Sequence, residues 1–150
     1  MPNNLNIIRA SLEHLEIVVP LFDAYRQFYR WPSDLAGARA FLAERLSRNE
    51  SAIFLAESDG AYHGFTQLYP SFSSGRMERL WILNDLFVAP ASRGRGAGEA
   101  LLEHARQFAL ETGARGMVLE TATDNLTAQR LYERLGWVRD TEFYTYTLRL

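Results

Sequence analysis

Residues 93–98 have the side chains and the backbone freedom that suit a phosphate-binding site. They are Arg93, Gly94, Arg95, Gly96, Ala97 and Gly98. A short apolar run precedes them, and a stretch with helical periodicity follows. Guanidinium groups form paired hydrogen bonds with phosphate oxygens, and the free amides and the dipole at a helix N-terminus favour an anion. Because glycine also lets the backbone turn tightly and approach a ligand closely, this segment is predicted to bind a phosphate group.

Two common phosphate-binding motifs fit the segment less well. A P-loop requires Lys followed by Ser or Thr after its last glycine, whereas this chain has Glu99 and Ala100 there and no lysine at all. A dinucleotide-binding turn requires Gly or Ala at position 99, although Glu120 lies about where its ribose-binding acid is expected. Only about fifty residues follow the segment, too few for the rest of a doubly wound sheet. A nucleotide-binding oxidoreductase is therefore the least favoured interpretation.

The segment does match R-x-x-G-x-G, the pyrophosphate-binding signature of the GNAT superfamily of acyl-CoA-dependent N-acyltransferases. It follows L-F-V-x-P at residues 86–90, and residues 125–137 resemble the N-x-x-A-x-x-L-Y-x-x-x-G-F/W motif that lies downstream in that family. Two motifs in this order are far more specific than one glycine pattern. The run W-I-L-N-D-L-F-V at residues 81–88 is similar to the subgroup that includes polyamine, histone and D-amino-acid acetyltransferases.

Transfer of an acetyl group to an amine requires a base and an acid. An aliphatic amine with a pKa of about 10.4 is neutral in only about one molecule in 10³ at pH 7, so it must lose a proton, and the leaving thiolate must gain one. By resemblance, Tyr132 is the acid beside the thioester sulfur. Asn84 stands where related enzymes carry a carboxylate, so Asp85 is the first candidate for the base and Glu120 the second. The alternatives are a cation-binding or purely structural role for the two acids, and a structural Tyr132 that packs on the cofactor without transferring a proton.

The resemblance also implies how the acyl donor, acetyl-CoA, is bound, with the glycine-rich segment holding its pyrophosphate. Backbone groups of Leu86, Phe87 and Val88 are expected to bind the pantetheine arm, and one N–H there can stabilise the oxyanion of the thioester. Asn125 is expected to cap a helix and, by resemblance, to hydrogen-bond the same arm. Tyr132 lies on that helix and is expected to contact the cofactor. No metal is expected.

The segment 25–32, Y-R-Q-F-Y-R-W-P, is unusually aromatic for a connection between two helices. One interpretation is that its rings simply pack on the sheet. In the GNAT family this segment covers the acceptor site, so the resemblance implies that Tyr29 and Trp31 form the walls of a substrate pocket together with Asn84 and Asp85. Aromatic rings and carboxylates bind cations well, which favours a small cationic amine as the acceptor.

Hydrophobic periodicity predicts an α/β fold with the order β-α-α-β-β-β-α-β-α-β-β. The expected fold is the GNAT fold, a single mixed, mostly antiparallel sheet of about seven strands with flanking helices, forming one domain over residues 1–150. The predicted strands are 5–8, 52–57, 62–69, 80–88, 117–121, 137–139 and 143–148. The predicted helices are 12–29, 34–46, the stretch that starts at 97–98, and 125–136.

Composition restricts the partners of the chain. The net charge is -2 with no basic block, which argues against nucleic acid. Cysteine is absent, which excludes disulfides, thiolate metal sites and a cysteine nucleophile. No apolar run approaches twenty residues and the first ten residues do not resemble a signal peptide, so no membrane partner and a cytoplasmic location are expected. Dimers are common in the family, and Phe143, Tyr144 and Tyr146 are a candidate homodimer interface.

The sequence thus predicts an acetyl-CoA-dependent N-acetyltransferase that acts on a primary amine, with a polyamine or an amino acid as the preferred acceptor. The alternatives are a non-catalytic acyl-CoA-binding module and an acetyltransferase that modifies a protein lysine or N-terminus. The three histidines show no partner cluster and receive no role: they are His14, His63 and His104.

Overall fold

The computed structural model describes residues 4–150. The chain divides into two compact units, Met1–Leu119 and Glu120–Leu150. The first unit contains the sheet and three of the α-helices, and the second contains one short helix. No helix within residues 4–150 is both long enough and apolar enough to cross a membrane.

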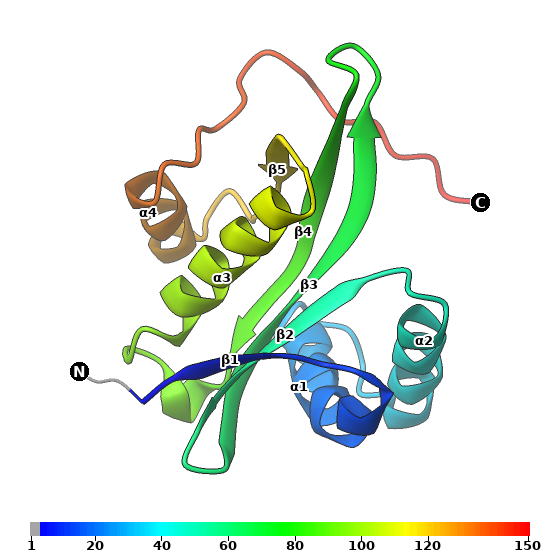
Figure 1. Ribbon diagram of the computed structural model, residues 1–150, viewed down its shortest axis with the longest axis vertical. Helices are drawn as coiled ribbons and strands as arrows, with labels where there is room; N and C mark the ends of the chain where they lie inside the picture. Colours follow the sequence, from blue (N-terminus) through cyan, green and yellow to red (C-terminus); the bar gives the residue numbers. More distant parts are fainter. Residues whose placement is uncertain (1–3) are drawn as a thin grey trace. The chain divides into compact units, whose positions relative to one another are not determined.

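The first unit is built on a five-stranded sheet with the order β1-β2-β3-β4-β5 (Figure 1). Each of the first four strands pairs antiparallel with its neighbour, and β5 pairs parallel with β4. The prediction of a mixed, mostly antiparallel α/β sheet is therefore confirmed. The strands are β1 (Asn6–Arg9), β2 (Ala52–Ser58), β3 (Ala61–Ser73), β4 (Glu78–Val88) and β5 (Gly116–Val118).

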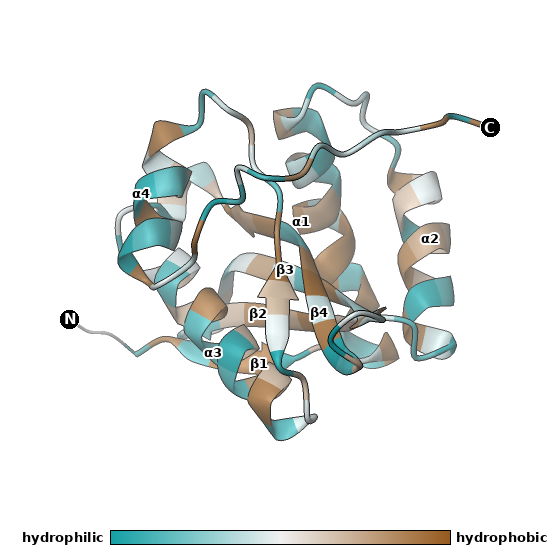
Figure 2. Ribbon diagram, turned by 90° about the horizontal axis from the view of Figure 1, so that it is seen from above, coloured by the Kyte–Doolittle hydropathy of each residue, from teal (hydrophilic) through white to brown (hydrophobic). Residues whose placement is uncertain are grey.

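Helices cover both faces of this sheet (Figure 1). Ile53 and Leu55 of β2 belong to a core cluster with residues of α1 and α2, whereas Phe54 packs edge-on against Phe108 of α3. Because successive residues of a strand point to opposite faces, α1 and α2 lie on one face and α3 on the other. Figure 2 shows the apolar residues concentrated on the central strands. The helices are α1 (Leu15–Phe28), α2 (Leu35–Ser47) and α3 (Ala97–Glu111), with 3₁₀ turns at η1 (Leu12–His14) and η2 (Pro90–Ser92).

Local signals account for several element boundaries. Asp59 and Gly60 join β2 to β3 with φ angles of 51° and 78°, as a two-residue hairpin turn requires. Asp34 caps α2, because its side chain accepts a hydrogen bond from the Gly37 amide at 2.9 Å. In the second unit, Asn125 caps α4 (Leu126–Arg134) by accepting from the Ala128 amide at 3.2 Å, so the predicted capping role of Asn125 is confirmed.

The two strands predicted at residues 137–139 and 143–148 are wrong, since neither range forms a strand. Phe143, Tyr144 and Tyr146 are 81%, 91% and 92% exposed. An alternating pattern indicates only that the side chains of a segment suit a strand. A strand also requires a neighbouring strand whose backbone forms hydrogen bonds with it. The sheet therefore has five strands instead of about seven. The role of these three aromatic residues in a homodimer stays a prediction.

Candidate active site

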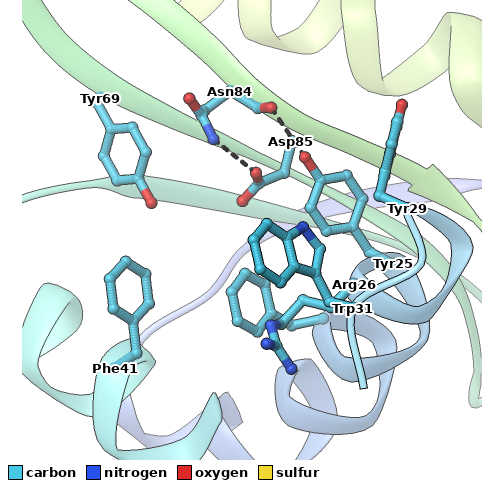
Figure 3. A pocket seen from close by; sticks show the side chains of 9 residues that line it. Tyr25, Arg26, Tyr29, Trp31, Phe41, Tyr69, Asn84 and Asp85 are labelled. Carbon is cyan, nitrogen blue, oxygen red and sulfur yellow. Dashed lines mark hydrogen bonds between the residues drawn. The ribbon is translucent and has the colours of Figure 1, made fainter. Parts of the chain in front are cut away.

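Asp85 of β4 is a buried carboxylate at the base of a cavity in the first unit (Figure 3). It is 2% exposed. Gln67 Nε2 donates to its Oδ2 at 2.5 Å and Asn84 Nδ2 donates to its Oδ1 at 2.9 Å. Burial raises the pKa of the Asp85 carboxyl above its usual value, while these hydrogen bonds act in the opposite direction. A carboxylate with a raised pKa is a stronger base than an exposed one, as proton removal from an amine requires.

A bulge in β4 decides which face of the sheet Asp85 occupies. Gln67 pairs with Asp85, but Leu68 pairs with Leu83, so Asn84 is an extra residue with no partner in β3. Trp81, before the bulge, packs on Phe108 of α3. After the bulge, the odd-numbered residues of β4 face α1 and α2 instead of α3. Phe87 shows this, because it belongs to the core cluster that contains residues of α1 and α2. The extra residue thus turns Asp85 toward the cavity.

The cavity has a volume of about 450 Å³ and opens between α1, α2 and the sheet, a size suited to a small molecule. It brings together the four residues predicted to contact the acceptor, Tyr29, Trp31, Asn84 and Asp85, although their roles stay predictions. Figure 3 shows these side chains around the cavity. The complete lining is Phe22, Tyr25, Arg26, Tyr29, Trp31, Phe41, Tyr69, Asn84 and Asp85.

Sequence reasoning missed several residues of this cavity. Tyr69 reaches it from β3 and Phe41 from α2, and no local pattern connects either position with Asp85. Tyr25 packs on Phe65, as the structural interpretation of the aromatic segment expected, but its hydroxyl also donates to the Asn84 carbonyl at 3.2 Å. Burial, followed by the nearby Asp85 charge, raises the pKa values of Tyr25, Tyr29 and Tyr69. These phenols therefore remain protonated hydrogen-bond donors at neutral pH.

The predicted phosphate-binding segment 93–98 connects η2 to α3. Gly94 and Gly96 adopt φ angles of 81° and 85°, and Gly96 is the N-cap residue of α3. Such angles are unfavourable for residues with a Cβ atom. The backbone that leads into α3 therefore has a conformation that only glycine adopts without strain. The amides of the first turn of α3 follow directly, and amides at a helix N-terminus can bind an anion. We call residues 93–98 the cradle.

The two arginines of the cradle differ in their contacts. Arg93 donates from Nε to the Val88 carbonyl at 2.9 Å, and its guanidinium carbon lies 5.4 Å from the centre of the Phe28 ring. One donor of Arg93 and one acceptor of Val88 are thus used within the protein. Arg95 instead lines a second cavity, of about 160 Å³, together with residues that include His63 and Ser92.

His63 does have partners, contrary to the sequence analysis. Its Nε2 lies 2.6 Å from Ser58 Oγ and its Nδ1 lies 2.8 Å from Ser92 Oγ. Its backbone carbonyl also accepts from the Ala89 amide at 2.8 Å. The residue therefore fixes the η2 turn that leads into the cradle. The sequence contains no sign of these contacts, because the partners of His63 lie in two other segments of the chain.

Three further predicted site residues belong to the second unit. Glu120 was predicted on the strand beside Asp85, but β5 ends at Val118, so that placement is wrong. Asn125 caps α4 as described. Tyr132 lies on α4, with its ring centre 6.2 Å from that of Trp137. Their predicted roles in catalysis and in cofactor binding stay predictions.

Comparisons with known proteins agree with this geometry. Residues 18–137 match the Acetyltransferase (GNAT) family. The chain is 48% identical over 146 residues to the uncharacterized N-acetyltransferase YhfO of Bacillus subtilis, covering 97% of this chain and 98% of that protein. A crystal structure of a probable acetyltransferase superposes with a TM-score of 0.90 at 47% identity over 97% of each chain. AAC(6')-Iy in complex with a bisubstrate analogue of CoA and monomethyl-acetylneamine shares the fold, with a TM-score of 0.82 at 24% identity over 99% of this chain and 100% of that chain.

Proposed function

This chain belongs to the GNAT family of acetyltransferases, and on that premise we propose that it transfers an acetyl group from acetyl-CoA directly to a primary amine bound beside Asp85. The observation that supports the proposal most is the burial of this single carboxylate at the base of an aromatic cavity. Such a cavity can hold an amine and remove its proton. A non-catalytic acyl-CoA-binding module would have no need for it.

The first task of the site is to deprotonate the amine. The acceptor arrives mainly as an ammonium ion, because the pKa of an aliphatic ammonium group is about 10.4. Asp85 attracts the cation and takes one proton, directly or through a water molecule. Gln67 and Asn84 hold the carboxylate in place by their hydrogen bonds at 2.5 and 2.9 Å. The lone pair that is freed on nitrogen then attacks the carbonyl carbon of the acetyl group.

The second task is to bind the donor and to protonate its leaving group. Acetyl-CoA supplies an acetyl group that is activated as a thioester. The cradle suits its pyrophosphate, because Gly94 and Gly96 hold the backbone at positive φ at the N-terminus of α3, where the helix dipole favours an anion. Leu86, Phe87, Val88 and Asn125 are proposed to bind the pantetheine arm. As the C–S bond breaks, Tyr132 is proposed to donate its phenolic proton to the thiolate.

The proposed acceptor is a small cationic amine, such as a polyamine or an amino acid. Tyr29 and Trp31 contribute aromatic faces to the cavity and Asp85 contributes a negative charge, a combination that binds ammonium groups. A solved neighbour with the same fold is AAC(6')-Iy in complex with a bisubstrate analogue of CoA and acetylneamine, which supports a small-molecule acceptor. A protein lysine or N-terminus is the second candidate, since Trp31 lines the cavity and is 58% exposed, so a larger acceptor can reach this wall.

Two measurements test this function in sequence. The thermal midpoint is measured with and without acetyl-CoA, with NADH as the control ligand. At a concentration of about one hundred times its Kd, a ligand adds about 2.7 kcal/mol, which raises the midpoint by several degrees. We expect a rise with acetyl-CoA and none with NADH. A panel of polyamines, amino acids and lysine peptides is then screened by the release of free thiol. Failure of acetyl-CoA to raise the midpoint would contradict the proposal.

A further inference from the structure

We propose that Asp23 is a positioning residue that fixes the loop between α1 and α2 against the acceptor cavity, and thereby sets the affinity for the amine. Asp23 lies outside the cavity lining, whereas Trp31 of this loop is part of it. The inference rests on the proposed function in one respect, namely that the cavity receives the amine. It assigns to Asp23 a role that the sequence motifs do not contain.

Asp23 is a buried charge whose hydrogen bonds converge on this loop. It is 4% exposed. Ser33 Oγ donates to its Oδ2 at 2.7 Å and the Asp34 amide donates to its Oδ1 at 2.8 Å. Gln27 Nε2, one turn further along α1, donates to Oδ2 at 3.0 Å. A buried carboxylate is costly unless it is paired and hydrogen-bonded, so the position of Asp23 depends on the loop, and the position of the loop depends on Asp23.

Arg26 continues the same set of contacts toward the cavity. Its NH1 atom lies 3.9 Å from Asp23 Oδ1 and donates to the Pro32 carbonyl at 2.8 Å. The Trp31 amide donates to the Arg26 carbonyl at 2.9 Å. One turn of α1 thus holds residues 31–34 by both backbone and side-chain hydrogen bonds. Arg26 itself lines the cavity, so the contacts that hold the loop extend directly to the substrate side.

The loop needs this support because its backbone is unfavourable. Arg30 has a φ angle of 68°, in the left-handed region, which is unfavourable for a residue with a Cβ atom. Asp34, which the Asp23 carboxylate binds, is also the N-cap residue of α2. Asp23 therefore fixes both the end of the loop that carries Trp31 and the start of the helix that carries Phe41, two walls of the same cavity.

The chemistry of the network requires a carboxylate. The hydrogen bond from Ser33, and after it the bond from the Asp34 amide, lower the pKa of the Asp23 carboxyl, because both stabilise its charged form. An asparagine at this position has nearly the same shape but presents an NH₂ group to one of the donors. The substitution Asp23→Asn therefore loosens the loop without leaving a void.

The test compares Asp23→Asn with Glu16→Gln. Glu16 also joins α1 to α2, through an ion pair between its Oε1 and Arg39 NH2 at 2.6 Å, but its side chain is 67% exposed and Arg39 lies in α2, outside the loop. We expect Asp23→Asn to raise the KM for the amine about tenfold, as loss of about 1.4 kcal/mol of binding energy would. Its KM for acetyl-CoA should change less than about twofold. Glu16→Gln should change neither value by more than about twofold.

Amide hydrogen exchange gives a readout that does not depend on turnover. In Asp23→Asn, the amides of residues 30–34, apart from Pro32, which has no N–H, should exchange faster than in the wild type, while those of α3 keep their rates. Equal increases in both KM values, or unchanged exchange in residues 30–34, would overturn the inference. If the wild type acetylates no amine, the proposed function fails, but the exchange experiment still tests the positioning role.

Ser33→Ala provides a second variant in case Asp23→Asn does not fold. Ser33 is exposed apart from its hydroxyl contact, and its replacement removes only the bond of 2.7 Å. The expected increase in the KM for the amine is about threefold, with faster exchange limited to residues 30–34. Exchange rates and a KM identical to those of the wild type would contradict the inference.

Discussion

The cradle and the cavity at Asp85 are the two proposed binding regions, and they are built in opposite ways. The cradle is one contiguous segment, residues 93–98, and its properties come from backbone amides and from two glycines with positive φ. The cavity draws side chains from α1, the loop that follows it, α2, β3 and β4, at positions from 22 to 85. The cradle therefore depends on the conformation of one short backbone segment, whereas the cavity depends on side chains that only the tertiary fold brings together.

Their charges differ as well. The cradle has the positive end of α3 and includes Arg95, which suit the phosphate group that it is proposed to bind. The cavity has the carboxylate of Asp85 at its base and protonated phenols around it, and the guanidinium of Arg26 in its lining is paired with Asp23. Opposite charges at the two regions suit a polyanionic donor and a cationic acceptor. Substitutions in one region should therefore change the kinetic constants of one substrate only.

The largest effect is expected for Asp85→Asn. The amide keeps the shape of the carboxylate but cannot take a proton from the amine, so kcat should fall by about 10²–10⁴. The KM for acetyl-CoA should change by less than about threefold, since the cradle is intact. Initial rates with varied donor and acceptor measure both constants, with Glu16→Gln as the control. A kcat close to that of the wild type would assign a purely structural role to Asp85.

The pH dependence of the rate provides an independent check on the same residue. The base must be ionised to act, so the wild-type rate should fall as the pH drops through the pKa of Asp85. Burial raises this pKa. The acidic limb of the pH–rate profile should therefore lie at a higher pH than the usual aspartate pKa of about 3.9. Asp85→Asn should lack this limb. An identical limb in both proteins would assign it to another group.

An intermediate effect is expected for Gly96→Ala, which changes the cradle alone. Gly96 has a φ angle of 85°, and alanine pays about 1–2 kcal/mol for this conformation. The KM for acetyl-CoA should rise about tenfold while the KM for the amine stays the same. Gly75→Ala is the matched control, because Gly75 has no positive φ and no atom within 4 Å of an added Cβ. An equal effect of both alanines would contradict the proposed binding role of the cradle.

The smallest of these effects is expected for Trp31→Ala, which opens one wall of the cavity. Loss of a cation–π contact at a partly exposed site costs about 0.5–1 kcal/mol, so the KM for the amine should rise about two- to fivefold. Phe72→Ala serves as the control, since Phe72 is 68% exposed and lies outside the cavity. If Trp31→Ala instead raised the KM for acetyl-CoA, the separation of the two regions would be lost.

The sequence alone determined those features whose signals are local. The glycines of the cradle, the turn at Asp59 and Gly60, and the cap at Asn125 each depend on residues within a few positions of one another. Backbone angles and nearby hydrogen bonds are properties of short segments, so their residue types can be recognised directly. Hydrophobic periodicity also predicted the strands of residues 5–88 and the helices, because it reports the buried side of each element, whereas the antiparallel pairing was implied by the resemblance to the GNAT family.

The tertiary structure decided whatever depends on a partner far away in the chain. Residues 143–148 alternate like a strand but have no paired backbone. Asp85 faces the cavity only because the bulge at Asn84 shifts the register between β3 and β4. Asp23 acquires its role from Ser33 and Asp34, and His63 from Ser58 and Ser92. A hydrogen bond between distant segments leaves no periodic trace in the sequence, so these residues can be identified only once the chain has folded.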